Sequence, residues 1–128
     1  MSDEFGDLAA QGITRIENEL LIRDFLEVMS LRDAQAMDPF LHPEVRFTGP
    51  SSEVEGKTAV LDLCRELFDT LSTFEVKAVV MSSVEQFVLV EEVVWVSFDA
   101  ACRAHSLMGF ASFEIVNYQV INWRQLHG

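Results

Sequence analysis

The feature that most constrains the fold is a β-like run of thirteen residues, FVLVEEVVWVSFD, at positions 87–99. Side chains along a strand alternate between two faces. The even-numbered set is apolar except for Glu92, whereas the odd-numbered set is mixed and becomes polar toward its end. A carboxylate among apolar groups is costly unless it is paired, hydrogen-bonded or neutral. Either Glu92 faces a cavity that contains other polar groups, or the strand lies in a different position from the one predicted.

Helical patterns precede this run. Residues 1–12 are acidic and predict a flexible lead-in, after which Thr14 and Glu17 have capping-box spacing for a helix to about Ser30. Asp33 is the expected cap of a shorter helix that contains Pro39, a residue that breaks or restarts helices. A third helix, with one apolar stripe, is expected over about 57–71.

Strand patterns dominate the rest of the chain. A short strand is expected at 45–48, and four longer strands follow at 74–83, 87–99, 103–116 and 119–126. The short connections between these four strands favour antiparallel pairing. With no internal repeat or linker, the sequence predicts one α+β domain over 13–128, with helices first and then a strongly curved sheet.

Charge and composition narrow the possible partners. The formal net charge is −12, from 21 acidic and 9 basic side chains, which argues against nonspecific nucleic-acid binding and against docking on an anionic membrane. The N-terminus lacks the pattern of a secretory signal, and no apolar run approaches the roughly 20 residues needed to span a bilayer. Cys64 and Cys102 fall in no CxxC pattern, so we expect reduced thiols and a cytoplasmic location.

Two sequence motifs, together with the order of the elements, resemble those of a known superfamily. G-K-T-A-V opens the third helix at 56–60, and F-E-I-V-N-Y-Q-V-I-N-W-R closes the sheet at 113–124. Together they resemble the NTF2-like superfamily, closest to its SnoaL-like and limonene-1,2-epoxide-hydrolase branch. The resemblance implies a cone-shaped barrel whose sheet wraps around a helix and leaves a deep pocket. Members use that pocket for isomerisation, cyclisation, dehydration, epoxide hydrolysis or binding, so the fold alone does not choose a function.

The residues that carry chemistry in that superfamily are replaced in this chain. Relatives with epoxide-hydrolase activity carry E-R-x-D and W-R-D, where this chain has Glu91-Glu92-Val93-Val94 and Trp123-Arg124-Gln125. The assisting Tyr and Asn fall on Arg46 and Thr48. Valine and glutamine cannot trade protons, so the water-activating set is absent. The two acids of ketosteroid isomerases fall on Thr48 and Ala111, so that set is absent too.

The resemblance and the strand alternation together predict an apolar pocket that binds a small hydrophobic metabolite. Gly109 and Ala111 would leave room in it, and no metal or cofactor motif is visible in the sequence. The expected lining residues are Thr48, Val90, Val94, Val96, Leu107, Gly109, Ala111, Ile121, Trp123 and Gln125.

Arg46 and Glu92 are the candidate chemical groups of this pocket. If both point inward, they form an ion pair, with Thr48 and Gln125 as hydrogen-bond partners. Such a pair is either purely structural or part of a rearranged catalytic site, with Glu92 as acid or base and Arg46 stabilising negative charge. An unpaired Glu92 would instead have a raised pKa, because burial disfavours the charged form.

Three functions therefore remain open from the sequence. The first is a binding domain for a small apolar ligand, and the second is an isomerase, cyclase or epoxide-hydrolase-like enzyme with Glu92 and Arg46 in its site. The third is a dimeric scaffold whose cavity is filled by side chains. Trp95, Met108 and Phe110 share the outward parity of the sheet, and relatives commonly pair through that face, so a homodimer is expected.

Overall fold

The computed structural model describes residues 2–101 and 103–127 of the 128-residue chain. Three α-helices and six strands, one strand more than predicted, form a fold of the α+β class that the sequence predicts. In chain order the elements are α1 (Ser2–Ser30), α2 (Ala34–Met37), the 3-10 turn η1 (Asp38–Phe40), β1 (Leu41–Thr48), β2 (Glu53–Glu55), α3 (Lys57–Thr70), β3 (Thr73–Val84), β4 (Phe87–Ser97), β5 (His105–Val116) and β6 (Gln119–His127).

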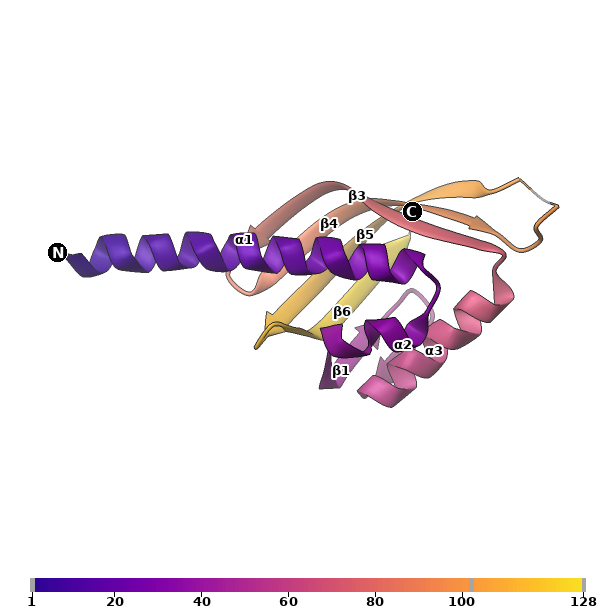
Figure 1. Cartoon of the computed structure of the whole chain (residues 1–128), viewed down its shortest axis with the longest axis horizontal. Helices are drawn as coiled ribbons and strands as arrows, with labels where there is room; N and C mark the ends of the chain where they lie inside the picture. The colour runs from indigo at the N-terminus through magenta and orange to yellow at the C-terminus, as the bar shows by residue number, and fades with distance from the viewer. Residues whose placement is uncertain (1, 102, 128) are drawn as a thin grey trace.

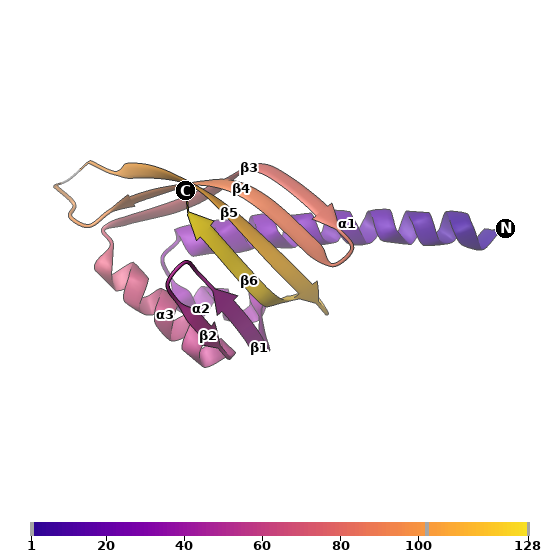
Figure 2. The ribbon, with the colours of Figure 1, turned by 180° about the vertical axis from the view of Figure 1, so that it is seen from behind.

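The six strands make one curved sheet in the order β2-β1-β6-β5-β4-β3. Only the β1–β6 contact is parallel among the strand pairs of the described residues, and the four consecutive pairs are antiparallel hairpin neighbours, as their short connections predict. All three helices lie on one face of the sheet (Figure 1). The view from behind shows the other face without helical cover (Figure 2). We call these the inner and the outer face.

The N-terminal helix differs from the sequence prediction. It begins at Ser2, so residues 2–12 are helical and not a flexible lead-in, and Thr14 is not an N-cap. The Thr14 hydroxyl instead donates to the carbonyl oxygen of Ala10, 2.9 Å away, inside the helix. Residues 2–30 contain no proline, so nothing in the sequence forces the helix to start later. The first turns of α1 extend past the sheet (Figure 1).

The C-terminal half of α1 is fixed to the inner face. Four apolar side chains at helical spacing are buried there: Ile22, Phe25, Leu26 and Met29. The Ser30 hydroxyl accepts a 3.0 Å hydrogen bond from the backbone N–H of Val76 on β3, and the Arg32 guanidinium donates to the carbonyl oxygen of Leu71. These bonds connect the end of α1 to the start of the long hairpin.

In the middle of the chain the helices match the prediction, but one strand is longer than predicted and one strand was not predicted. Asp33 caps α2 by accepting a 3.1 Å hydrogen bond from the N–H of Gln35, and Pro39 lies in the 3-10 turn that follows. β1 is longer than expected because its first residues pair with β6, and β2 is an additional short edge strand that pairs only with β1. Such a short edge strand has little sequence signal.

The alternation along β4 is the one the sequence predicts. Val88, Val90, Glu92 and Val94 are buried on the inner face. Beside them, aromatic rings of three other elements form a cluster around Trp123, whose ring centroid lies 4.8 Å from that of Phe47 and 5.5 Å from that of Phe25. This cluster closes the end of the inner face that α1 covers. The end under α3 is left less densely filled.

Candidate functional site

A cavity of about 120 Å³ lies on the inner face, between α3 and the strands β3, β4 and β6. Helix α3 contributes an apolar wall because Val60, Cys64 and Phe68 recur at helical spacing. The strands contribute every second residue, which puts Glu92, Trp123 and Gln125 on the same surface. The complete lining is Met29, Phe47, Val60, Leu63, Cys64, Leu67, Phe68, Phe74, Val76, Glu92, Val94, Trp123 and Gln125.

Three polar groups in this apolar lining form a hydrogen-bonded chain. The indole Nε1–H of Trp123 donates to Gln125 Oε1 at 3.1 Å, and Gln125 Nε2–H donates to Glu92 Oε1. Glu92 is only 2% exposed. Strand alternation places Trp123 and Gln125 side by side on β6, and Glu92 reaches them from β4 across Gly109 and Ala111 of β5.

The charge state of Glu92 follows from its surroundings. Burial raises its pKa above the ordinary value of 4.5, and the weaker opposing effect is the hydrogen bond from Gln125. No arginine or lysine of residues 2–101 and 103–127 forms an ion pair with it. Burial also raises the pKa of the neighbouring Cys64 thiol to about 11, so this thiol stays protonated at neutral pH.

The hydrogen bonds from Trp123 to Gln125 and from Gln125 to Glu92 also determine which oxygen of Glu92 carries a proton. An indole N–H can only donate, so the oxygen of the Gln125 amide must face Trp123 and its NH₂ group must face Glu92. Glu92 Oε1 is therefore an acceptor in either charge state. When Glu92 is neutral, its proton resides on Oε2, so the carboxyl becomes a hydrogen-bond donor at that atom.

The ion pair between Arg46 and Glu92 required both side chains to point inward, and this condition is not met. Val45 and Phe47 point inward on β1, so the residues that alternate with them, Arg46 and Thr48, point to the outer face. Arg46 Nη2 lies 2.7 Å from Glu55 Oε1 on β2, and both side chains are exposed. The sequence comparison identified the strand correctly but misassigned which of its residues face inward.

The other predicted lining residues fall into three groups. Val94, Trp123 and Gln125 line the cavity. Val90, Gly109 and Ala111 are buried and Val96 is half-buried against the core, but none of these four lines the cavity.

The third group lies outside both the cavity and the buried core. Thr48 and Ile121 line hollows of the outer surface, and Leu107 is exposed. Ile121 misses its predicted orientation because the pairing of β5 with β6 shifts between Glu114 and Ile115, which removes Ile121 from the regular alternation.

Most of the cavity wall was missed from the sequence. The apolar stripe of α3 was visible, but a stripe that lines a cavity has the same pattern as one that fills a core. Phe47, Phe74 and Val76 likewise read as ordinary strand residues. Which of these side chains leave space between them depends on the distance between α3 and the sheet, which no local pattern encodes.

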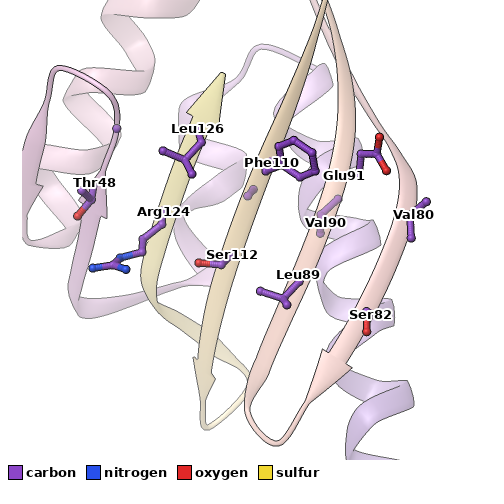
Figure 3. A pocket seen from close by; sticks show the side chains of 12 residues that line it. Thr48, Val80, Ser82, Leu89, Val90, Glu91, Phe110, Ser112, Arg124 and Leu126 are labelled. Carbon is purple, nitrogen blue, oxygen red and sulfur yellow. The ribbon is translucent and has the colours of Figure 1, made fainter. Parts of the chain in front are cut away.

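The outer face carries a shallow groove of about 550 Å³ that crosses the middle strands (Figure 3). Leu89, Phe110 and Leu126 are apolar side chains on this groove, with Glu91 and Arg124 among them. Met108 and Phe110 are exposed, as their predicted outward parity requires, and Trp95 is half-buried with the Lys77 Nζ 5.9 Å from its ring centroid.

Comparison with known proteins identifies the class to which this fold and this cavity belong. The model of the SnoaL-like domain matches residues 22–123, so the chain belongs to the SnoaL-like family. No curated protein matches the chain. Among the described residues, no helix is long and apolar enough to cross a membrane, and no cluster of three or more His, Cys, Asp or Glu side chains could hold a metal ion.

Solved structures show the same fold at low sequence identity. An LEH-like epoxide hydrolase from M. tuberculosis has a TM-score of 0.78 and 18% identity, over 89% of this chain and 84% of that one. A putative polyketide cyclase from Xanthomonas campestris pv. campestris has a TM-score of 0.80 and 18% identity, over 90% and 93%. An NTF2-like protein of unknown function from Burkholderia pseudomallei has a TM-score of 0.78 and 16% identity, over 88% and 91%. At these identities the likeness establishes the NTF2-like fold and leaves activity open.

Proposed function

We propose that the inner cavity binds a small, uncharged and mostly apolar organic molecule that carries one hydrogen-bond acceptor, such as a carbonyl or ether oxygen. The observation that carries this proposal is the buried Glu92 carboxyl, which faces an apolar cavity with a glutamine and no described cation as its partner. Such a lining, apolar with a few convergent polar groups, is typical of small-molecule sites.

The size of the cavity limits the ligand. An apolar cavity of roughly 150 Å³ accommodates one benzene molecule. At about 120 Å³, the cavity in this state is somewhat smaller, so a single six-membered ring is the upper limit of what it holds. A larger ligand would have to extend past the cavity or displace a wall side chain such as Leu67, which is already partly exposed.

The chemistry of Glu92 supports an acceptor on the ligand. A neutral Glu92 donates from Oε2, because Oε1 is occupied by Gln125. The relatives named as an epoxide hydrolase and a putative polyketide cyclase carry names that refer to oxygen-bearing organic substrates. Their names support the general kind of ligand for this family and do not identify the ligand of this chain.

The experiment is an NMR titration of the two tryptophan indole N–H signals, which the chain's only two tryptophans supply. Trp123 lines the cavity and Trp95 does not, so a Trp95→Phe variant assigns the signals. We expect cyclohexanone to shift the Trp123 signal with higher affinity than methylcyclohexane or cyclohexylammonium. Failure of all three probes to shift that signal, with the Trp123 peak intact, would refute the proposed binding.

The pH dependence separates the role of Glu92 from that of the apolar wall. Cyclohexanone binding should weaken as pH rises through the raised pKa of Glu92, because the ionised carboxylate has no proton to donate. A Glu92→Gln variant keeps an uncharged N–H donor at every pH, so its binding should not change with pH. Cys64 does not confuse this titration, because its pKa is about 11.

An acid–base enzyme is the second candidate, and the raised pKa of Glu92 favours it. A carboxyl whose pKa is raised keeps its proton to a higher pH than an ordinary glutamic acid does, and in that state it can act as a general acid toward an epoxide or carbonyl oxygen. Arg46 takes no part in this version, since it pairs with Glu55 on the other face. Turnover of an epoxide or enolisable ketone that Glu92→Gln abolishes, with ring-sized ligands still bound, would favour the enzyme over the binding domain.

We also propose that the protein forms a homodimer through its outer face. The exposed Met108 and Phe110 and the groove beside them support this surface as the interface. Light scattering should give twice the chain mass of 14.5 kDa, and Phe110→Asp should give the monomer. Phe98→Asp is the control, because Phe98 is also an exposed phenylalanine but follows the end of β4. A monomeric wild-type protein would contradict the proposal.

A further inference from the structure

A further hollow lies between α1 and the turns that connect β3 to β4 and β5 to β6. Figure 1 shows α1 passing the first of these turns. The volume of the hollow is about 740 Å³, several times that of the inner cavity, and it shares no residue with that cavity. We call it the end groove and define it by Thr14 and Asn18 of α1, Gln86 of the first turn, and Ile115, Asn117 and Tyr118 around the second turn.

Asn18 is the most buried polar group of the end groove. It is only 5% exposed, yet its side chain makes no hydrogen bond to any residue in the described part of the chain. No buried side-chain nitrogen or oxygen of the described residues is both sealed and unpaired, so the Asn18 amide is reachable from the groove. Buried polar side chains normally have a partner, and here the groove is where a partner can bind.

Tyr118 is the second unusual residue. It follows Asn117 in the two-residue turn between β5 and β6, and both have positive φ angles, 52° for Asn117 and 61° for Tyr118. Turns of this kind favour Asn followed by Gly, because a side chain in this left-handed region is strained. Tyrosine is therefore a poor choice for the turn itself. Its ring is 67% exposed and lines the end groove, so packing inside the protein does not explain it either.

The lining determines what kind of ligand would fit. The groove carries one positive and two negative side chains, Arg15, Glu17 and Glu85, so it selects neither a strong anion nor a strong cation. The remaining polar groups are neutral amides and two hydroxyls, each of a kind able to donate and to accept. A matching ligand therefore carries closely spaced groups that also donate and accept, and an apolar face that packs on the Tyr118 ring.

Saccharides and peptide backbones are two ligand classes with closely spaced donors and acceptors. A peptide adds to a sheet along a free strand edge. The end groove lies at strand ends, beside two turns, whereas the free edges of this sheet belong to β2 and β3. The geometry thus favours the ring and hydroxyl groups of a sugar over an extended peptide.

We propose that the end groove is a binding site for a neutral saccharide, with the sugar ring on Tyr118 and a hydroxyl group hydrogen-bonded to Asn18. This site is independent of the inner cavity and of any reaction there, because the two share no lining residue. The protein would then combine a small apolar ligand on its inner face with a sugar at the end of its sheet.

The test is isothermal titration of the full chain with maltose, cellobiose and lactose at millimolar concentrations, followed by the same titrations on three variants. We expect at least one disaccharide to bind with a Kd in the millimolar range or lower. Tyr118→Gly and Asn18→Ala should each weaken that binding about 10-fold or more, which corresponds to loss of one principal contact. Tyr118→Phe keeps the ring and should retain most of the affinity.

Neither weakening variant should unfold the protein, so a loss of binding cannot be attributed to misfolding. Tyr118→Gly relieves the strain of a left-handed tyrosine and should raise Tm by roughly 3 °C. Asn18→Ala removes an unpaired amide and places the best helix former in α1, so Tm should stay equal or rise. The inner cavity supplies a further control, since cyclohexanone should still shift the Trp123 signal in both variants.

Three outcomes would overturn the proposal. The first is no heat of binding with any of the three sugars. The second is sugar binding that Tyr118→Gly and Asn18→Ala leave unchanged. The third is binding of acetylated tetra-alanine amide in place of the sugars, which would make the groove a peptide site. None of these outcomes affects the proposal for the inner cavity, so the two can fail separately.

Discussion

Glu92 and Glu55 are carboxylates on two strands of one sheet, and the two faces of that sheet give them opposite environments. Glu55 is exposed on the outer face, 2.7 Å from the guanidinium of Arg46, where water screens both charges. Glu92 is buried on the inner face with an amide as its partner, and burial raises its pKa. The Arg46–Glu55 ion pair is thus solvent-exposed, where an ion pair contributes little to the free energy of unfolding. The buried Glu92 carboxyl, whose burial has a larger effect on the free energy of unfolding, has the uncharged Gln125 amide as its hydrogen-bond partner instead.

The largest expected change in the free energy of unfolding comes from substituting two neighbouring residues of β6 that face opposite sides of the sheet. Trp123→Ala removes the ring that contacts Phe25, Phe47 and Phe113 and should lower the free energy of unfolding by about 3–5 kcal/mol. Arg124→Ala, one residue further on the outer face, should change it by less than about 0.5 kcal/mol. Urea unfolding of the two variants measures both values. Equal losses would contradict the assignment of inner and outer faces.

The second prediction concerns a variant that breaks the hydrogen bonds connecting Trp123, Gln125 and Glu92. Gln125→Met keeps the volume but leaves the Trp123 indole N–H and the Glu92 carboxyl without their described partner, which should cost about 2 kcal/mol. The Gln125 hydrogen bond lowers the pKa of Glu92, so its removal should raise that pKa further. Urea unfolding between pH 4 and pH 8 gives both quantities. An unchanged pH profile would show that Gln125 does not act on Glu92.

The third prediction concerns the charge of Glu92. A carboxyl whose pKa is higher in the folded than in the unfolded protein binds more protons when folded, so the free energy of unfolding falls as pH rises from 4.5 to the raised pKa. Glu92→Gln cannot ionise and should lack this decline. At neutral pH it should therefore be more stable than the wild type. At pH 4 the two proteins should have nearly equal stability.

The matched control for this prediction is the adjacent residue on the other face. Glu91→Gln removes one carboxylate at the same place along β4 but on the outer groove, so its stability should follow the wild-type pH profile. A pH profile that Glu91→Gln flattens and Glu92→Gln leaves intact would show that the two faces are assigned the wrong way round.

The smallest expected effect belongs to the outer ion pair. Arg46→Ala should lower the free energy of unfolding by no more than about 1 kcal/mol, and by less at high salt. In a double-mutant cycle with Glu92→Gln, the two changes should add within about 0.5 kcal/mol, because the residues share no partner. A larger coupling energy would revive the Arg46–Glu92 pair that the sequence suggested.

The sequence by itself determined most of the elements and the fold class, and it drew attention to Glu92. Period-two alternation along 87–97 puts four successive even residues on one face, and a carboxylate among valines is conspicuous in any register. The same logic assigned Val94, Trp123 and Gln125 to the inner face correctly. Each of these conclusions rests on patterns that span only a few residues, which the strand geometry fixes locally.

The tertiary structure decided what those residues meet. Whether Arg46 and Thr48 face inward or outward depends on the offset between β1 and the rest of the sheet. The orientation of Ile121 depends on a shift in the pairing of β5 with β6. The space beside Glu92 depends on how far α3 lies from the sheet, and the end groove depends on a helix that passes two distant turns. A pairing offset or an interelement distance results from packing over the whole chain, so no local stretch of sequence contains it.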